Sequence, residues 1–121
     1  DRGLVTLASL QELRKLDLRH TRISSTGLTS LAGLPKLRHL KCAHVRGLNA
    51  KAIRSFSRMK SLETLELQQT GIPIPGLAAL SSNLGLKRLY LGETEAASEE
   101  LQTLQRVLPE CLISWWPKKG E

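Results

Sequence analysis

Aromatic side chains are scarce in this 121-residue chain, at 3% of the sequence. The core therefore has to be built from aliphatic side chains. Long hydrophobic runs are missing too, since no stretch approaches the roughly 18 to 20 apolar residues that cross a bilayer as a helix. This excludes a membrane-spanning helix, and the amino end shows no signal-peptide pattern. The chain begins at Asp1 instead of Met, which predicts a processed or truncated amino end.

Acidic residues are missing from a long stretch, because none occurs between Asp17 and Glu63. Residues 1–60 contain 13 Lys/Arg and 3 Asp/Glu, a net charge of +10. Residues 61–121 contain 5 and 8, a net charge of −3. An imbalance of this kind bears on partners and solubility and not on the fold.

The chain does contain one leucine pattern, which occurs four times. The copies start at Leu13, Leu37, Leu62 and Leu86, at intervals of 24, 25 and 24 residues. Each copy has the spacing Leu-x-x-Leu-x-Leu, with one cysteine in place of a third leucine. Leucine alternating with polar residues predicts a strand with one buried face. A stripe of apolar residues three apart follows each copy and predicts a short helix, and the fixed period predicts stacked units.

This pattern resembles the leucine-rich repeat family, in particular the short repeats of about 24 residues in bacterial proteins and the ribonuclease-inhibitor-like, cysteine-containing class. The resemblance covers nearly all of the chain. It implies an α/β fold, a right-handed leucine-rich repeat solenoid with a parallel curved sheet on the concave side and short helices on the convex side. Strands are expected at about 14–19, 38–43, 63–68, 87–92 and 112–116.

We expect a single domain, residues 1–121, that belongs to a longer chain. Its parts are a partial amino-terminal repeat (1–12), four repeats (13–110), a carboxy-terminal cap strand (111–117) and a tail (118–121).

The two ends of the stack are expected to differ. Leu4, Leu7 and Leu10 copy the helical half of a repeat, so we expect them to pack on the next helix, at Leu28 and Leu31. Their outer side has no strand to cover, and an exposed apolar edge tends to recruit a neighbour. The amino-terminal end is therefore expected to contact another domain or subunit.

At the carboxyl end, Cys111, Ile113 and Trp115 alternate with other residues, which predicts an edge strand. A tryptophan there is expected to cover the open end of the leucine column, and Pro117 to discourage further strand pairing.

Both cysteines are expected to be structural. Cys42 takes the place of Leu18, Leu67 and Leu91 in the other copies, which predicts a small buried side chain. Cys111 has the register of Leu13. The two thiols lie about three repeats apart, so they are beyond disulfide reach in a stack.

Polar residues predict where the helices begin. Ser24 or Ser25 is placed to cap the first helix and Asn49 the second. Pro73 and Pro75 predict a rigid loop, with the third helix starting near Gly76 or Leu77.

The outward strand positions form columns, because equivalent residues on neighbouring parallel strands lie about 4.8 Å apart. The resemblance implies that such positions hold a protein partner. Asp17, Lys41 and Glu66 also fit a simpler interpretation, a ladder of opposite charges that stabilises the sheet whether or not anything binds. The candidate partner-binding residues are Lys15, Asp17, Arg19, His39, Lys41, Thr64, Glu66, Gln68, Arg88 and Tyr90.

The basic half supplies a second candidate surface. An acidic protein, such as a neighbouring domain or subunit, is the favoured partner. The alternative is nucleic acid or another anionic surface bound through residues 19–60, although this half offers no aromatic side chains for base stacking. The predicted basic patch comprises Arg22, Lys36, Arg38, Arg46, Lys51, Arg54, Arg58 and Lys60.

Metal binding and catalysis are not predicted. His20 and His44 are equivalent and hence adjacent, followed by Gln69 and Glu93, but Gln69 separates the carboxylate from the imidazoles by about 10 Å. No phosphate-binding glycine motif occurs. An open sheet offers a surface without an enclosed site. We therefore expect a non-catalytic protein-interaction module without a cofactor or metal.

Overall fold

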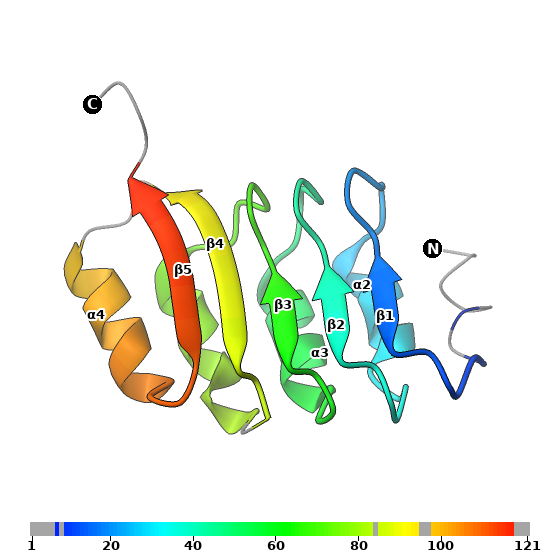
Figure 1. Ribbon diagram of the computed structural model, residues 1–121. Helices are drawn as coiled ribbons and strands as arrows, with labels where there is room; N and C mark the ends of the chain where they lie inside the picture. Colours follow the sequence, from blue (N-terminus) through cyan, green and yellow to red (C-terminus); the bar gives the residue numbers. More distant parts are fainter. Residues whose placement is uncertain (1–6, 8, 84, 95–97, 118–121) are drawn as a thin grey trace.

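The computed structural model describes residue 7 and residues 9–83, 85–94 and 98–117. Five parallel strands form one sheet in the order β1-β2-β3-β4-β5 (Figure 1), which confirms the predicted parallel sheet. The strands are β1 (Lys15–Asp17), β2 (His39–Lys41), β3 (Thr64–Glu66), β4 (Arg88–Thr94) and β5 (Leu112–Pro117).

The leucine spacing sets the register of this sheet. Leu16, Leu40, Leu65 and Leu89 lie side by side across β1 to β4, and Ile113 continues the line on β5. The three central leucines are completely buried, whereas the residues at the two ends of the line are half-buried. Successive strand residues point to opposite faces, so each buried leucine is flanked by residues on the other face.

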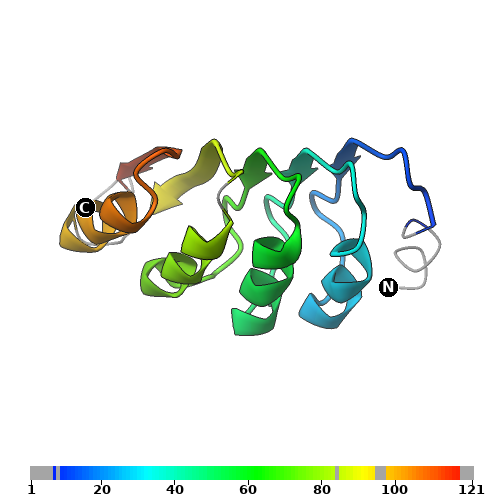
Figure 2. The ribbon, with the colours of Figure 1, turned by 90° about the horizontal axis from the view of Figure 1, so that it is seen from below.

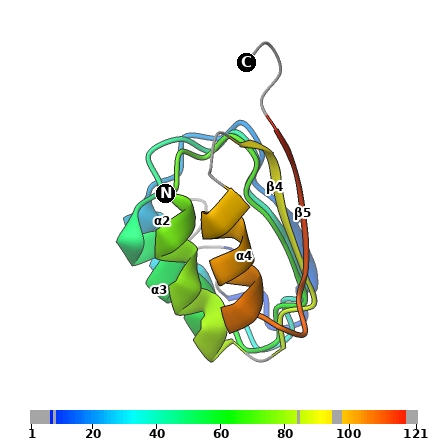
Figure 3. The same cartoon turned by 90° about the vertical axis from the view of Figure 1, so that its left-hand side faces the viewer.

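Helical segments cover one face of the sheet and make the structure two layers thick (Figures 2 and 3). They are α2 (Ser25–Leu28), which continues directly into the 3₁₀ turn η1 (Thr29–Leu31), then α3 (Ala50–Arg58), the 3₁₀ helix η2 (Ile74–Ser82) and α4 (Ser98–Val107).

Two of the predicted helix caps are confirmed. Ser24 Oγ accepts a hydrogen bond from the backbone N–H of Gly27 at 3.1 Å and caps α2. Asn49 Oδ1 accepts one from the backbone N–H of Lys51 at 2.9 Å and caps α3. Buried Ser25 ties the two units together, since its Oγ accepts from the backbone N–H of Asn49 at 3.1 Å.

The third helical segment differs from its prediction in start and in kind. It begins at Ile74, with Pro73 as the preceding cap residue, and not near Gly76 or Leu77. Pro75, the second residue of the segment, suits this first turn, because its fixed φ is helical and its missing N–H would have no partner there. All nine residues form a 3₁₀ helix, whereas such helices are ordinarily three or four residues long.

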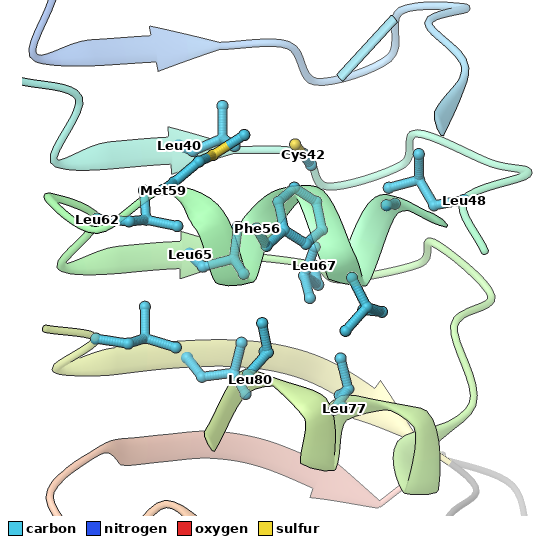
Figure 4. Packing of buried hydrophobic residues seen from close by; sticks show 14 of the residues in the cluster. Leu40, Cys42, Leu48, Phe56, Met59, Leu62, Leu65, Leu67, Leu77 and Leu80 are labelled. Carbon is cyan, nitrogen blue, oxygen red and sulfur yellow. The ribbon is translucent and has the colours of Figure 1, made fainter. Parts of the chain in front are cut away.

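The core lies between the two layers and is almost entirely aliphatic. Phe56 of α3 and Met59, the residue that caps its end, lie over the sheet leucines of β2 and β3 (Figure 4). Cys42 is completely buried in the leucine column, as predicted, and both cysteines are free. Burial raises the pKa of Cys42 to about 12 and that of Cys111 to about 11. Both side chains therefore stay protonated thiols at neutral pH.

One buried polar side chain forms hydrogen bonds with the backbone carbonyl groups at the end of α3. Asn83 donates hydrogen bonds to the carbonyl oxygens of Phe56 at 3.1 Å and Met59 at 2.9 Å, and its Oδ1 accepts from the N–H of Gly85 at 3.2 Å. The carbonyls at a helix end lack partners within the helix, so Asn83 satisfies them from the next unit.

The pairing of β4 with β5 is irregular. Tyr90 pairs with Ser114, but Trp115 pairs with Gly92, so Leu91 has no partner and forms a bulge. Gly92 has a left-handed φ of +67°, which glycine adopts without steric cost.

The predicted right-handed leucine-rich repeat solenoid is wrong. The structure is a small α/β domain with an open, all-parallel, five-stranded sheet, and its units are not copies of one another. The strands have 3, 3, 3, 7 and 6 residues, and the covering segments alternate between α and 3₁₀ geometry. Repeat proteins stack one structural unit on its neighbours. The leucine spacing determined the inward residues, but it did not determine the backbone that connects them.

The predicted contacts at the two ends are confirmed only in part. Leu7 packs against the core, but Leu10 is 47% exposed, and Leu4 lies outside the described residues. Trp115 is 39% exposed, so part of its side chain remains open to solvent. The predicted tail, 118–121, also lies outside the described residues.

Candidate protein-interaction surface

One face of the sheet is open over the described residues, because the helices all lie on the other side (Figures 2 and 3). Alternate strand positions point to this open face. On β2 and β3 these side chains are half-buried. The residues of the open face are Lys15, Asp17, His39, Lys41, Thr64, Glu66, Arg88, Tyr90, Leu112 and Ser114.

The register brings the predicted partner-binding residues together in rows across the strands. The row of Lys15, His39, Thr64 and Arg88 is continuous. Arg19 and Gln68, also among the predicted partner-binding residues, lie just beyond the ends of β1 and β3. Backbone hydrogen bonds keep the strands in step there, from His20 to Ala43 at 3.3 Å and from His44 to Gln68 at 2.7 Å.

A second row joins Asp17, Lys41, Glu66 and Tyr90. Lys41 lies beside Asp17 across the strands and its charge helps to lower the pKa of Asp17, as the predicted charge ladder requires, but the direct ion pair of Asp17 is with Arg19. Neither Lys41 nor Glu66 forms an ion pair with another described residue. Both charges are therefore available to a partner.

The side chains of Asp17 and Arg19 form a bidentate ion pair on this surface, the Asp17–Arg19 fork. Arg19 Nε lies 2.9 Å from Oδ1 of Asp17, and Nη2 lies 2.7 Å from Oδ2. The backbone N–H of Arg19 also donates to Oδ1 at 3.1 Å. These hydrogen bonds lower the pKa of Asp17 from 3.8 to about 2, and they raise the pKa of Arg19. The pair is solvent-exposed and so contributes little to stability, but it holds the guanidinium in one orientation.

Gln68 lies across Gly92 on the neighbouring strand. A Cβ atom at Gly92 would lie 2.6 Å from Cγ of Gln68 and 3.0 Å from its Cβ. Oε1 of Gln68 is buried and accepts no hydrogen bond from the described residues. The glycine therefore makes room for the glutamine side chain.

The residues of the predicted basic patch come from several separate elements. Arg22 and Arg46 follow β1 and β2, whereas Arg54 and Arg58 lie on α3. The others are engaged locally. Lys36 forms an ion pair with Glu12 at 2.8 Å, and Arg38 forms one with Glu63 at 3.6 Å. Lys51 donates a hydrogen bond to the hydroxyl of Thr26 at 3.2 Å, and Lys60 donates one to the backbone carbonyl of Ser82 at 3.0 Å.

Glu63 connects the basic half to the second half. Lys87 Nζ lies 3.1 Å from one carboxylate oxygen of Glu63, and Arg38 Nε lies 3.6 Å from the other. The hydrogen bond from Lys87, followed by the charges around it, lowers the pKa of Glu63. Glu63 thus neutralises part of the basic charge at the end of the sheet where the strands begin.

His20 and His44 lie together, as the sequence predicted. Their rings are stacked, with centroids 4.4 Å apart and planes 13° from parallel. Stacked rings direct their nitrogen atoms along the ring planes and not toward a common point between them. Glu93, the predicted next acid, lies in β4, paired with Trp116. Among the described residues, no group of three His, Cys, Asp or Glu side chains is placed to bind a metal.

Sequence reasoning missed the apolar surface on the edge strand. Leu112 is 61% exposed and Trp116 is 51% exposed. Leu112 pairs with Arg88, so it points to the open face. The alternation of Cys111, Ile113 and Trp115 contained this signal, since it directs the residues between them outward.

Comparison with known proteins leaves the family open. No family model matches the chain, and no curated protein matches it, so membership of the leucine-rich repeat family stays a prediction. Among solved structures the chain is similar to leiomodin-1 actin-binding site 2. The TM-score is 0.73 at 12% identity, over 94% of this chain and 78% of that chain. At this identity the likeness shows a shared fold.

The helices give no sign of a membrane-crossing segment. Within the described residues, none of them has the length and apolar character needed to span a bilayer.

Proposed function

We propose that this chain is a non-catalytic protein-binding domain that recognises its partner through the open face of the sheet. The observation that carries the proposal is the ordered set of side chains on that face. They come from neighbouring strands in register and are half-buried at its centre. Holding such side chains in place costs less entropy on binding than ordering long, freely rotating ones.

The chemistry of the face fits a protein partner. Lys41 and Glu66 offer charges that no described residue pairs with, the Asp17–Arg19 fork offers a fixed guanidinium, and Tyr90 adds an amphipathic ring. Tyrosine and arginine are enriched at the centres of protein interfaces. The similar structure of leiomodin-1 is that of an actin-binding site, so actin is the first purified protein to test here.

The excess of basic charge favours an acidic partner, since it speeds encounter with a negative surface. Nucleic acid is the weaker candidate. Binding along a phosphate backbone needs a continuous basic track, whereas the basic residues here lie on separate elements and several are already engaged.

A photo-cross-linking side chain at two positions tests the proposal. Thr64 lies at the centre of the open face, and Gln102 is exposed on α4, on the opposite side of the molecule. After irradiation with cellular protein and nucleic acid, we expect saturable protein adducts from the Thr64 position and none from the Gln102 position. Equal labelling at both positions, or adducts that contain nucleic acid only, would refute the proposal.

A matched pair of charge reversals then measures the contribution of the face to binding of the cross-linked protein. Arg88 lies on the open face and Arg106 on α4, and both side chains are exposed. We expect Arg88→Glu to weaken the affinity about tenfold or more, as for like charges placed in an interface, and Arg106→Glu to leave it unchanged.

A further inference from the structure

Strand β5 lies at the edge of the sheet and has a strand neighbour on one side only, among the residues that the structure describes (Figure 1). The backbone N–H of Leu112 donates to the carbonyl of Lys87 at 2.8 Å, so Leu112 bonds toward β4. The backbone groups of successive strand residues point to opposite sides of the strand. Ile113 and Trp115 therefore direct their N–H and C=O groups away from β4. Such a row of unpaired groups is a template for another strand.

The edge formed by β5 lacks the usual protection against pairing. Exposed sheet edges ordinarily carry charged side chains, but residues 112–117 contain none. Leu112, Trp115 and Trp116 are instead large, apolar and exposed. Pro117 comes only at the end of the strand, where its missing N–H limits pairing to the residues before it.

The sequence of β5 is complementary to itself in antiparallel orientation. With a two-fold axis at Ser114, Ile113 of one copy lies opposite Trp115 of the other, and the two residues exchange N–H···O=C hydrogen bonds in both directions. Leu112 then lies opposite Trp116 of the other copy. Apolar side chains therefore meet on both faces of the joined sheet, and aromatic and aliphatic pairs of this kind stabilise neighbouring strands.

The neighbouring registers form fewer of these hydrogen bonds. Moving the axis one residue toward the start of β5 places Trp115 opposite Cys111, whose N–H already donates to the carbonyl of Leu108 at 3.1 Å. Moving it one residue the other way places Ile113 opposite Pro117, which has no N–H to donate. Only the register between these two gives every outward group of Ile113 and Trp115 a partner.

The distribution of charge favours the same pairing. Residues 1–60 have a net charge of +10 and residues 61–121 one of −3. Because β5 lies at the opposite end of the sheet from β1 (Figure 1), joining two copies through β5 keeps their basic halves far apart. Helix α4, at the same end of the molecule (Figure 3), has Glu99 and Glu100 in its first turn and Arg106 in its last. Antiparallel pairing directs the acidic turn of each α4 toward the same end of the dimer as the basic turn of the other, so the charges are complementary.

We propose that β5 is a self-association surface, through which two copies of this chain pair in antiparallel orientation about Ser114 and join their sheets into one. The two-fold axis is perpendicular to the sheet, so the two open faces lie on the same side of the dimer. This association goes beyond the proposed partner binding, since it needs no other protein. If the Thr64 cross-linker captured a partner while the chain never associated with itself, the open face would stand and only this surface would fall.

Sedimentation equilibrium of the whole chain tests whether two copies associate. An interface of one strand per copy belongs to the small, weak class, so we expect the mass to rise from one chain to two between about 5 and 500 µM. A mass of one chain throughout would leave the edge to a strand of another protein and would overturn the proposal. A mass that climbs beyond two chains would indicate head-to-tail pairing of β5 with β1, and would overturn it as well.

A cysteine at position 114 tests the register. Residues opposite each other in a non-hydrogen-bonded antiparallel pair have Cα atoms about 4.5 Å apart, within reach of a disulfide. At a concentration where two copies associate, mild oxidation should link Ser114→Cys to itself, as mass spectrometry of the linked peptides would show. Thr64→Cys is the matched control, because Thr64 is also half-buried on the open face but lies on the central strand. Equal linking of the two variants, or none in Ser114→Cys, would contradict the proposed pairing.

Three further variants separate the backbone from the side chains of β5. Trp115→Pro removes an outward N–H and leaves the hydrogen bonds to β4 in place, a position at which an edge strand tolerates proline. Leu112→Lys places a charge on the edge, as protected edges do. We expect each of these to weaken association about tenfold or more, as for a central interface residue. Trp115→Phe keeps the N–H and an aromatic ring and should associate like the unchanged chain.

Circular dichroism establishes that each variant is folded before its association is measured. The side chain of Leu112 is exposed in the single chain, so Leu112→Lys retains the fold even if Trp115→Pro does not. Undiminished association of Leu112→Lys would show that the copies meet elsewhere, and the proposal would be wrong.

Discussion

The first three strands and the last two have the same leucine spacing but different lengths. β1, β2 and β3 have 3 residues each, whereas β4 has 7 and β5 has 6. Each short strand is followed by a residue with positive φ, namely His20, His44 or Gln69. In β4 the positive φ falls one position earlier in the pattern, at Gly92, and the strand absorbs it as a bulge. Strand length is thus set by the backbone that follows the third apolar position, and not by the leucines.

The open face changes along with the strand length. Over β1 to β3 it carries charged and polar residues, as at Lys15, Lys41 and Glu66. On β5 it carries Leu112 and Ser114. One sheet therefore offers a polar, ordered surface at one end and an apolar edge at the other.

The largest expected effect contrasts a buried leucine with an exposed one. Leu65 of β3 is completely buried and Leu112 of β5 is 61% exposed. We expect Leu65→Ala to lower the free energy of unfolding by about 2–5 kcal/mol, through lost burial and a cavity. Leu112→Ala should change it by no more than about 0.5 kcal/mol. Chemical denaturation measures both. A loss above about 1.5 kcal/mol for Leu112→Ala would show that the edge strand is packed more like the first three than the structure indicates.

Substitution of Gly92 in the bulge is expected to lower the free energy of unfolding by a smaller amount. Gly92→Ala places a Cβ 2.6 Å from Cγ of Gln68 and forces alanine to a φ of +67°. We expect a loss of about 2–4 kcal/mol by chemical denaturation, from strain plus overpacking.

Gly47→Ala is the matched control for this substitution. Its φ is +83°, but nothing lies within 4 Å of the new Cβ, so only the backbone cost of about 1–2 kcal/mol should appear. Gln68→Ala in the Gly92→Ala background should recover part of the difference. Equal losses at the two glycines would mean that contact with Gln68 does not shape the bulge.

The smallest effect concerns the Asp17–Arg19 fork on β1. Its hydrogen bonds lower the pKa of Asp17 from 3.8 to about 2. Because the pKa is lowered in the folded chain, the ionised carboxylate of Asp17 stabilises the fold at pH values above its ordinary pKa of 3.8. This stabilisation is lost as the pH falls through about 2. Because the pair is exposed, the change in stability between pH 4 and pH 2 should be slight.

NMR titration of the Asp17 carboxyl carbon measures this shift directly. We expect a midpoint near pH 2 in the unchanged chain and a return toward the ordinary value in Arg19→Gln. Arg22→Gln should leave the midpoint in place, since Arg22 does not contact Asp17. If the midpoint were already ordinary in the unchanged chain, the fork would not form in solution.

The sequence predicted the parts of the fold that side-chain chemistry determines. Leucine spacing predicted the parallel sheet and its register, because only one register buries Leu40, Leu65 and Leu89 together. The caps at Ser24 and Asn49 were predictable because their side chains satisfy backbone groups locally. The adjacency of His20 and His44 followed from the same register.

The parts that depend on the backbone were not predictable from this pattern. The 3₁₀ geometry of η2 and the bulge at Gly92 are backbone features that leucine spacing does not specify. Local ion pairs were missed too. Asp17 pairs with Arg19 two residues away in place of Lys41 on the next strand, which strand register alone does not reveal.

The edge strand also determines what tryptophan fluorescence reports for this chain. Both of its tryptophans, Trp115 and Trp116, lie in β5, and both are partly exposed in the folded state. Their emission is therefore expected to be already red-shifted before unfolding, and to respond to whatever approaches this edge. An emission signal from this chain is a probe of its last strand, while melting of the leucine core has to be followed by circular dichroism.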